Sequence, residues 1–214
     1  MLRRILTTVM FLLPLAASAQ MLPNLPRLGT DYEVLPTPQP TYGQGKIEVA
    51  EVFSYSCIHC AELQPAVNTW KKTLPADVRY EYVPAPFGGV WDNASRAFLA
   101  AQAMGIQPRT HDAVFKAVFI EHKINTGSLE DFADIYAGLG IDRSKFLATM
   151  NSFAVTSRMA KAKQFALRTG VNSTPTIVVN GKYRAMSTRD RGHAGLLATI
   201  NFLVAKERAE KKKP

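Results

Sequence analysis

Hydrophobic and polar positions follow two different spacings along this chain, and each change of spacing predicts a new element. Residues 47–55, IEVAEVFSY, form a short run of β-branched and aromatic residues, which is typical of a largely buried strand. The next segment places Leu63, Val67 and Trp70 on one face of a helix. VRYEYVPAPF, residues 78–87, again has strand character. The folded part therefore opens with a strand, a helix and a second strand.

Residues 91–170 differ from this beginning because helical spacing runs through nearly all of them. The breaks between the expected helices carry start and stop signals: Gly105 and Pro108, then Ser128 with Asp131, then Gly138 or Gly140, and a bend near Asn151-Ser152 in a longer stretch from Arg143 to Gly170. We expect an all-α block here. It should shield one side of the functional site and shape a groove there, with Trp91 and Phe115 in its core.

Strand character returns in TIVVNGKYRAM, where Asn180-Gly181 lies between two β-rich runs and predicts a hairpin with a two-residue turn. A last amphipathic helix is expected over about residues 191–206. We divide the chain into an export signal (1–19), an extended lead-in with five prolines and no regular structure (20–42), an α/β domain in two parts (43–90 and 171–207), the helical insertion (91–170) and a basic tail (208–214).

The first nineteen residues show the three zones of an export signal. Arg3 and Arg4 form the charged start, residues 5–17 the apolar stretch, and Ala17-Ser18-Ala19 the cleavage site. The alternative is a membrane anchor, but an apolar run of about thirteen residues is shorter than the roughly 20 that a spanning helix needs. We expect cleavage after Ala19 and a mature chain that is not embedded in a membrane. The general and the twin-arginine export routes both stay open.

The net charge of the 214-residue chain is +9, and it falls to +7 without the signal, which carries two arginines and no acidic residue. A basic excess raises the possibility of nucleic-acid binding. Much of the excess, however, lies in the tail KERAEKKKP, and the rest is scattered among acidic residues on helix-like segments. We therefore expect solvated helix faces and no nucleic-acid partner.

The candidate chemistry lies in Cys57 and Cys60, the only two cysteines, which are separated by Ile58 and His59. A zinc site would need further ligands, and the other histidines are widely spaced: His111, His122 and His193. A purely structural disulfide across so small a loop would add little stability. We favour redox exchange, in which one sulfur forms a mixed disulfide and the other resolves it, without metal or cofactor.

The position of Cys57, after a buried strand and at the first turn of a helix, favours a thiolate there. Unpaired N–H groups and the positive end of the helix dipole face its sulfur. Lowering a thiol pKa from about 8.5 to about 4 requires roughly 6 kcal/mol, of which the dipole supplies at most about 2 kcal/mol. We expect hydrogen bonds from the His59 and Cys60 N–H groups, the Cys60 thiol and the His59 ring to supply the rest.

With its export signal, its Cys57-Ile58-His59-Cys60 motif and its late Ser173-Thr174-Pro175-Thr176 segment, the chain resembles the DsbA family of the thioredoxin superfamily. The resemblance covers essentially the whole mature chain. It implies an α/β thioredoxin fold with an inserted all-α helical domain. It also implies that Cys57 is the exposed nucleophile, that Cys60 is the buried resolving thiol, and that His59 tunes the pair.

The resemblance further implies that Pro175 is a cis-proline lying against the redox pair, with the backbone of Thr174 binding an extended substrate segment. Without the resemblance, a trans bond would be expected before Pro175. Ile58 stands where the family most often has proline, so the redox potential can differ from the family's typical value in either direction. Thr174 also varies among relatives and is a candidate for tuning substrate release.

Glu51 is an acidic residue within the first apolar strand, six positions before Cys57. Two interpretations stay open. It is either an exposed strand position or, as in similar chains, a buried carboxyl that relays a proton to Cys60, with its pKa raised by burial. Arg79 on the next strand is a candidate neighbour of Glu51.

The function implied is that of a periplasmic dithiol oxidase. The Cys57–Cys60 disulfide would pass to reduced, newly exported polypeptides, and a membrane protein of the DsbB type, implied by the resemblance alone, would restore it. A disulfide isomerase or reductase is an alternative within enzymes. Periplasmic isomerases usually dimerise through an extra amino-terminal domain, for which residues 20–42 are too short, so we expect a monomer. A binder of unfolded exported chains is the non-enzyme alternative.

Overall fold

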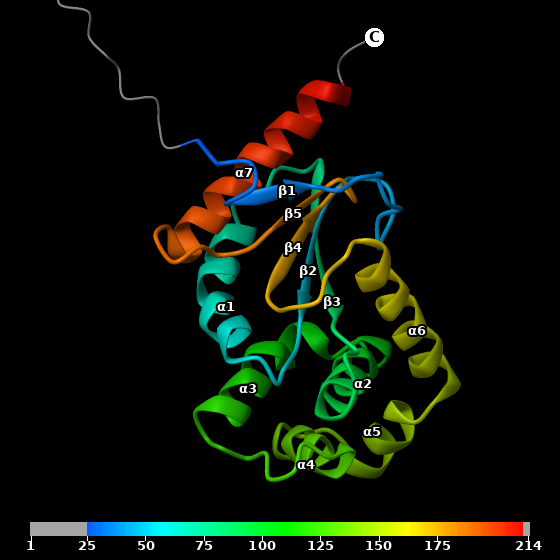
Figure 1. Cartoon of the computed structure of the whole chain (residues 1–214). Helices are drawn as coiled ribbons and strands as arrows, with labels where there is room; N and C mark the ends of the chain where they lie inside the picture. The colour runs from blue at the N-terminus through cyan, green and yellow to red at the C-terminus, as the bar shows by residue number, and fades with distance from the viewer. Residues whose placement is uncertain (1–24, 212–214) are drawn as a thin grey trace, which may run out of the picture.

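A computed structural model describes residues 25–211. The expected export signal and its cleavage after Ala19 lie outside the described residues. In chain order (Figure 1), the elements are β1 (Tyr32–Val34), β2 (Ile47–Phe53), α1 (Ile58–Lys71), β3 (Val78–Pro84), α2 (Val90–Ala103), α3 (Gln107–Phe119), α4 (Leu129–Gly138), α5 (Arg143–Met150), α6 (Phe153–Arg168), β4 (Thr176–Val179), β5 (Tyr183–Ala185) and α7 (Gly192–Lys211).

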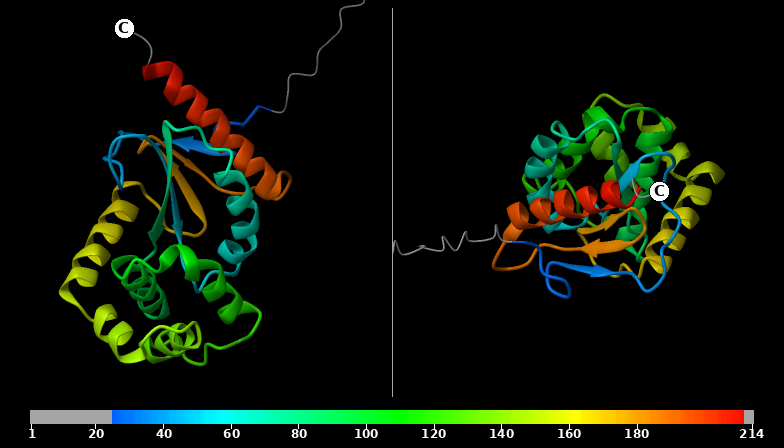
Figure 2. Two further views of the ribbon diagram at one scale, coloured as in Figure 1. Left: turned by 180° about the vertical axis from the view of Figure 1, so that it is seen from behind. Right: turned by 90° about the horizontal axis from the view of Figure 1, so that it is seen from above.

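The five strands form one mixed sheet in the order β1-β5-β4-β2-β3. β2 and β3 run parallel, whereas β4 is antiparallel to β2, β5 to β4 and β1 to β5. All seven residues of β2 are buried. A strand reads as continuously apolar when both of its faces are covered, and Figure 2 shows helices on both sides of this sheet.

The side chains of β2 alternate between two buried clusters. Val49 and Phe53 belong to a large cluster that includes Leu63 of α1 and Leu203 of α7. The intervening positions, such as Val52, belong to a smaller cluster formed with α6. Because successive strand residues point to opposite faces, α1 and α7 cover one face of the sheet and α6 covers the other.

The helices α2 to α6 lie between β3 and β4 in the chain, and α2 to α5 cap one end of the sheet, whereas α6 runs back alongside it (Figure 1). Their boundaries follow the signals in the sequence: Ser128 caps α4 by accepting the N–H of Asp131 at 3.1 Å. The expected bend at Asn151-Ser152 is a full break, because Ser152 caps a new helix. An α/β thioredoxin fold with an inserted helical block is confirmed.

The lead-in differs from the expectation, because its residues 32–34 form the edge strand β1. Tyr32 pairs with Ala185 and Val34 with Tyr183 of β5. The four prolines of this region that the structure describes lie outside the strand, so none of them removes a ladder hydrogen bond. The prediction of no regular structure in the lead-in was therefore wrong for these three residues.

The last helix is longer than its sequence pattern suggested. α7 continues to Lys211, through the start of the expected basic tail. Ion pairs hold this extension to the rest of the protein: Arg208 pairs with Asp77 at 2.7 Å, and Lys182 pairs with both the buried Glu207 and Glu210, each at 3.0 Å. None of the helices within residues 25–211 is long and apolar enough to cross a membrane.

The β4–β5 hairpin turns at Asn180-Gly181, as expected. Both residues have positive φ, 49° and 65°, and the N–H of Lys182 donates to the carbonyl of Val179 at 2.9 Å. Pairing resumes with Val179 opposite Tyr183, so the loop holds three residues and not two. A side chain at Gly181 would collide with the carbonyl oxygen of Gln39, 1.9 Å from the position of its Cβ.

Candidate redox site

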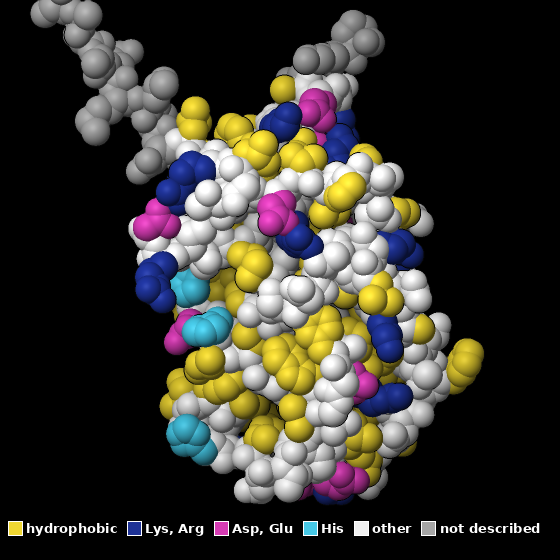
Figure 3. Space-filling view, in the orientation of Figure 1, with side chains coloured by type: hydrophobic (Ala, Val, Ile, Leu, Met, Phe, Trp, Pro, Cys, Tyr) yellow, Lys and Arg dark blue, Asp and Glu magenta, His cyan; other side chains and the backbone are white. Residues whose placement is uncertain are grey.

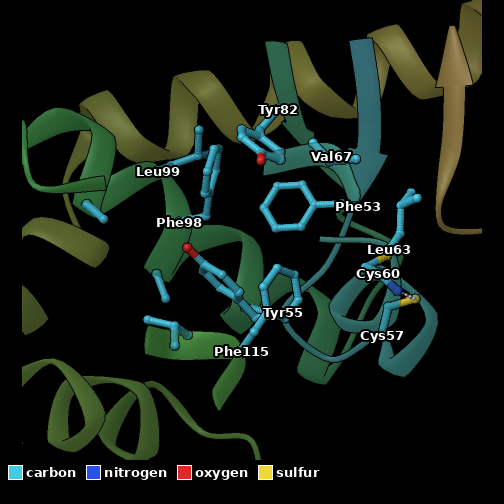
Figure 4. Close-up of a cluster of buried hydrophobic side chains, with 14 of the residues drawn as sticks. Phe53, Tyr55, Cys57, Cys60, Leu63, Val67, Tyr82, Phe98, Leu99 and Phe115 are labelled. Carbon is cyan, nitrogen blue, oxygen red and sulfur yellow. Dashed lines mark hydrogen bonds between the residues drawn. The ribbon is translucent and has the colours of Figure 1, made fainter. Parts of the chain in front are cut away.

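Cys57 is the N-cap of α1 and lies just beyond the end of β2. Its backbone is extended, with φ −109° and ψ 111°, and its sulfur accepts the N–H of Cys60 at 3.3 Å. A side chain in this position replaces a missing partner of the helix start. Figure 4 shows the two cysteines one helical turn apart, joined by this hydrogen bond. Both are free thiols in the structure.

The cis-proline loop, which contains Thr174 and Pro175, lies against Cys57 of the redox pair. The Thr174–Pro175 bond is cis, as the resemblance implied. The Cys57 thiol donates to the carbonyl oxygen of Thr174 at 3.4 Å. Cys57 is consequently only 7% exposed, and Cys60 is fully buried. The expected nucleophile is therefore more covered than "exposed" suggested, because the Thr174 carbonyl lies against it.

The surroundings of Cys57 lower its pKa to about 6. The main cause is a hydrogen bond from the Cys60 thiol, followed by the Thr174 side chain and the backbone N–H groups of Cys60 and His59, while burial acts in the opposite direction. Donors of this kind stabilise the charged sulfur. The predicted donors are present except for one, the His59 ring.

The His59 ring points away from the sulfur and into solvent. Its side chain is 71% exposed, and its Nδ1 lies 2.9 Å from a carboxylate oxygen of Glu62. That hydrogen bond raises the pKa of His59. The expectation that the His59 ring bonds to Cys57 was wrong, because the ring is hydrogen-bonded to Glu62, which lies one helical turn later in α1. The backbone N–H of His59 acts on the sulfur instead.

Cys60 has the opposite environment from Cys57. Burial raises the pKa of its thiol far above the ordinary range, and its hydrogen bond to Cys57 and the nearby charge of Glu51 raise it further. Two sulfurs in one short motif thus differ strongly in acidity. This difference makes Cys57 the thiolate and Cys60 the protonated partner.

Glu51 lies in the middle of β2 and is only 1% exposed, which rules out the exposed interpretation. Burial raises its pKa to about 7, although a hydrogen bond from the Tyr80 hydroxyl opposes the rise. Arg79 is not its neighbour: it pairs with Glu48 at 2.6 Å. In the parallel register Glu51 lies opposite Tyr82. Side chains alternate between the two faces along β3, so Tyr80 lies on the same face of the sheet as Glu51 and Arg79 on the other face.

A cluster of aromatic side chains lies beside the two cysteines, and its members come from the end of β2 and from the helical block. Figure 4 shows Phe53, Tyr55 and Phe115 grouped beside the cysteines. The Tyr55 hydroxyl and His111 Nδ1 are 2.8 Å apart, and burial lowers the pKa of His111 to about 3. His111 is thus a neutral core residue. Within residues 25–211, no group of three or more His, Cys, Asp or Glu side chains could hold a metal ion.

Two grooves flank the redox pair, and the sequence showed neither in detail. The first, of about 280 Å³, runs over the cis-proline loop, with Thr174, Pro175 and Met186 in its walls. The second, of about 480 Å³, lies between α1 and α3 and is walled by Ile58 and Phe115. Ile58 is 44% exposed, so the residue between the cysteines reaches into the second groove.

A pair of thiols with such different acidities, held at a helix start against a cis-proline on a thioredoxin fold, defines a thiol:disulfide oxidoreductase. The comparisons with known proteins agree with this class. Residues 48–193 match the DSBA-like thioredoxin domain. The chain therefore belongs to the DsbA-like family.

Named relatives support the same family. The thiol:disulfide interchange protein DsbA of Pseudomonas aeruginosa is 43% identical over 185 residues, which cover 86% of this chain and 87% of the relative. The protein of the same description from Azotobacter vinelandii is 40% identical over 183 residues, covering 86% and 85% of the two chains.

Solved structures are similar as well. The crystal structure of Pseudomonas aeruginosa DsbA has a TM-score of 0.81 and 42% identity, with 87% of this chain and 97% of that chain covered. The oxidoreductase DsbA from Xylella fastidiosa has a TM-score of 0.80 and 38% identity, with 86% and 99% covered. The likeness therefore extends over sheet and helical block together.

Proposed function

We propose that this oxidoreductase acts as an oxidase that donates the Cys57–Cys60 disulfide to newly exported polypeptides. The observation that carries the proposal is the low pKa of Cys57, about 6. At neutral pH a thiol of this pKa is about nine-tenths thiolate. A reduced form stabilised in this way makes the disulfide a better electron acceptor.

The exchange proceeds in two steps. A substrate thiolate attacks the sulfur of Cys57 in the disulfide, and Cys60 leaves and takes up a proton. The second substrate thiolate then attacks the substrate's own sulfur in the mixed disulfide, and Cys57 leaves as a thiolate. The substrate loses two electrons and its thiol protons, and the protein gains the two electrons. The roles of Cys57 and Cys60 follow from their acidities.

Glu51 supports the proton transfer at Cys60. Its pKa of about 7 lets it hold or release a proton at neutral pH, and its charge acts on the Cys60 thiol. In the first step it would give its proton to the leaving Cys60 sulfur. In the reverse reaction it would take that proton back.

The cycle needs an oxidant to restore the disulfide. We propose that a membrane protein of the DsbB type accepts the two electrons from the reduced pair. We further propose that the chain acts in the periplasm as a monomer, after its export signal has been cleaved behind Ala19. The relatives named above are thiol:disulfide interchange proteins DsbA, which supports the exchange reaction on which this cycle depends.

A redox titration of the purified protein against glutathione tests the oxidase. We expect an equilibrium potential above that of the cytosolic glutathione pool, together with stoichiometric oxidation of a reduced, unfolded substrate. A potential as low as the glutathione pool, with rapid reduction of insulin, would show a reductase. Binding of unfolded chains without any change in their thiols would show a mere binder.

A further inference from the structure

The groove over the cis-proline loop has a wall that the redox motif does not supply. Residues 186–189 form this outer wall, and they belong to the β5–α7 loop (residues 186–191). Thr174 and Pro175 form the side nearest to the redox pair. A polypeptide joined to the Cys57 sulfur lies beside this cis-proline groove, because the carbonyl oxygen of Thr174 is only 3.4 Å from that sulfur. The position of the outer wall therefore decides how the groove holds the joined chain.

The β5–α7 loop is bound by a buried carboxylate of the lead-in. This carboxylate belongs to Asp31, which is only 3% exposed. Because Tyr32 of β1 pairs with Ala185 of β5, the antiparallel register brings Asp31 next to the first residue of the loop. The carboxylate accepts hydrogen bonds from Arg191 at 2.8 Å and from the Thr188 hydroxyl at 3.4 Å. One side chain of a distant segment thus binds the loop at two points.

Arg27 connects the same carboxylate to the loop a second time. Its guanidinium donates to both carboxylate oxygens of Asp31, at 2.9 and 3.0 Å, and to Asp190 of the loop at 2.7 Å. These bonds hold the pKa of Asp31 well below its usual range. Asp31 therefore stays charged at neutral pH and balances Arg191, whose side chain is only 14% exposed. On the face seen in Figure 3, basic and acidic side chains gather at the left edge, over the turn from β5 into α7.

Packing alone does not fix the outer wall, because a second pocket lies next to it. This pocket has a volume of about 240 Å³ and is lined by Met186 together with Thr30, Asp31 and Ser173. Met186 borders the cis-proline groove as well. A side chain between two open spaces lacks the close packing that holds a core residue in one place. The bonds at Asp31 are therefore what keeps the wall in its position.

We propose that Asp31 is a positioning residue for the substrate. Its carboxylate keeps the β5–α7 loop in place as the outer wall of the cis-proline groove, and this wall contacts the polypeptide whose cysteine reacts with Cys57. The inference rests on the proposed function, since it concerns the substrate of the same site. It separates two properties: Asp31 affects the binding of a polypeptide and leaves the chemistry of the two sulfurs unchanged.

Two thiols of different size test this separation. One is a short peptide with a single central cysteine, and the other is N-acetylcysteine amide, which has no flanking residues. The reaction followed is the opening of the Cys57–Cys60 disulfide by each thiolate. In Asp31→Asn the rate constant of the peptide should fall about tenfold, the factor for losing one or two hydrogen bonds between substrate and wall. The rate constant of N-acetylcysteine amide and the pKa of Cys57 should stay the same.

Asp77→Asn is the matched control. The carboxylate of Asp77 also binds an arginine through both of its oxygens, Arg208 at 2.7 and 2.8 Å, but it lies outside the cis-proline groove. Its ratio of peptide to N-acetylcysteine amide should equal that of the unchanged protein. Arg27→Gln is a milder second variant, because the Arg27 side chain is 49% exposed, and it keeps the test open if Asp31→Asn does not fold. Its ratio should fall about twofold to threefold.

A ratio that neither variant changes would overturn the inference. Equal losses for the peptide and for N-acetylcysteine amide would overturn it as well, because they would mean that Asp31 acts on the sulfurs themselves. A loss of the same size in Asp77→Asn would assign the effect to general loosening of the protein. Failure of the oxidase proposal looks different, since it appears in the equilibrium potential of the unchanged protein and not in this ratio.

Discussion

Thr174 affects the redox pair through two different groups. Its carbonyl oxygen accepts the Cys57 thiol at 3.4 Å in the protonated state. Its hydroxyl is buried and has no hydrogen-bond partner among the described residues, and it lowers the pKa of Cys57 by stabilising the charged sulfur. His59 differs, because its exposed ring is bound to Glu62. At the scale of single residues, the proline loop therefore matters more for acidity than the histidine of the motif.

Thr174→Val should raise the pKa of Cys57 by about one unit, since it removes one charge-assisted hydrogen bond of several. Ultraviolet absorbance of the thiolate during a pH titration measures the value. His59→Ala keeps the backbone N–H that faces the sulfur, and its rise should be smaller. A larger rise in His59→Ala than in Thr174→Val would contradict this order.

Tyr80→Phe tests the buried carboxyl. The Tyr80 hydroxyl stabilises the charged form of Glu51, so its removal should move the pKa of Glu51 from about 7 to a higher value. The carboxyl signal of labelled glutamate, followed by NMR against pH, gives the value directly. Tyr183→Phe, which removes a tyrosine hydroxyl in β5, serves as the control and should leave Glu51 unchanged.

At the scale of elements, the hairpin between β4 and β5 depends on a turn that only glycine fits. Gly181 has φ 65°, and the carbonyl oxygen of Gln39 lies where its Cβ would be. The same two residues also tie the hairpin to the lead-in, because the N–H of Gln39 donates to the carbonyl of Gly181 at 2.7 Å. The turn is thus a joint between two segments far apart in the sequence.

Gly181→Ala should destabilise the protein by at least about 2 kcal/mol, from the positive φ and the collision together. Gly138→Ala in α4 is the matched control. A Cβ added at position 138 meets open space, and replacing a helical glycine by alanine stabilises the helix. Urea unfolding of both variants measures the difference. Equal stability of the two would show that the lead-in moves aside without cost.

Local signals predicted the elements whose causes are local, and missed those whose causes are distant. The start of α1 and the turn at Asn180-Gly181 follow from residues within one turn of each other. β1 depends on β5, about 150 residues later in the chain. The last turn of α7 depends on the pairing of Arg208 with Asp77. Sequence reasoning had no access to either contact.

The site shows the same division. The motif and the resemblance predicted Cys57 at a helix start, a buried Cys60 and a cis bond before Pro175, and the structure has all three. The partner of Glu51 was not, because it depends on the register of β2 and β3. The α1–α3 groove was anticipated only as a general feature of the helical block. Its lining depends on how two helices pack, and no motif in the sequence encodes that.

At the scale of the whole molecule, the acidity of Cys57 sets the energy difference between the reduced and oxidised forms. A pKa of about 6 stabilises the reduced form roughly tenfold at pH 7 relative to an ordinary thiol, which raises the potential by about 30 mV. A pKa of about 4, as considered from the sequence, would give about 90 mV. The structure thus favours a milder oxidant.

The stability of the reduced form should depend on pH in a defined window. Between pH 6 and about 8 the unfolded reduced chain holds a proton at Cys57 that the folded chain has lost, so stability rises with pH there. Above about pH 8 the rise ends, because the Cys60 thiol, whose pKa burial raises in the folded chain, ionises only in the unfolded chain. The oxidised form has no such thiol. Urea unfolding of the two forms from pH 5 to pH 8 should show the difference between their unfolding free energies widening above pH 6.

The reduced Cys57→Ser variant is the control for this experiment, because serine does not titrate in the window. Its unfolding free energy should follow the pH dependence of the oxidised protein. A difference that stays constant from pH 5 to pH 8 would mean that the Cys57 sulfur is protonated at neutral pH in the folded protein.

The edge strand β1 has a consequence for how the chain is made. It is the first strand within residues 25–211, yet its neighbour in the sheet, β5, is the last. Until nearly all of the polypeptide has been made, those three residues lack their partner strand. Completion of the sheet is thus a late event during synthesis, and a truncated product lacking the terminal hairpin would keep an open edge where other nascent strands can attach.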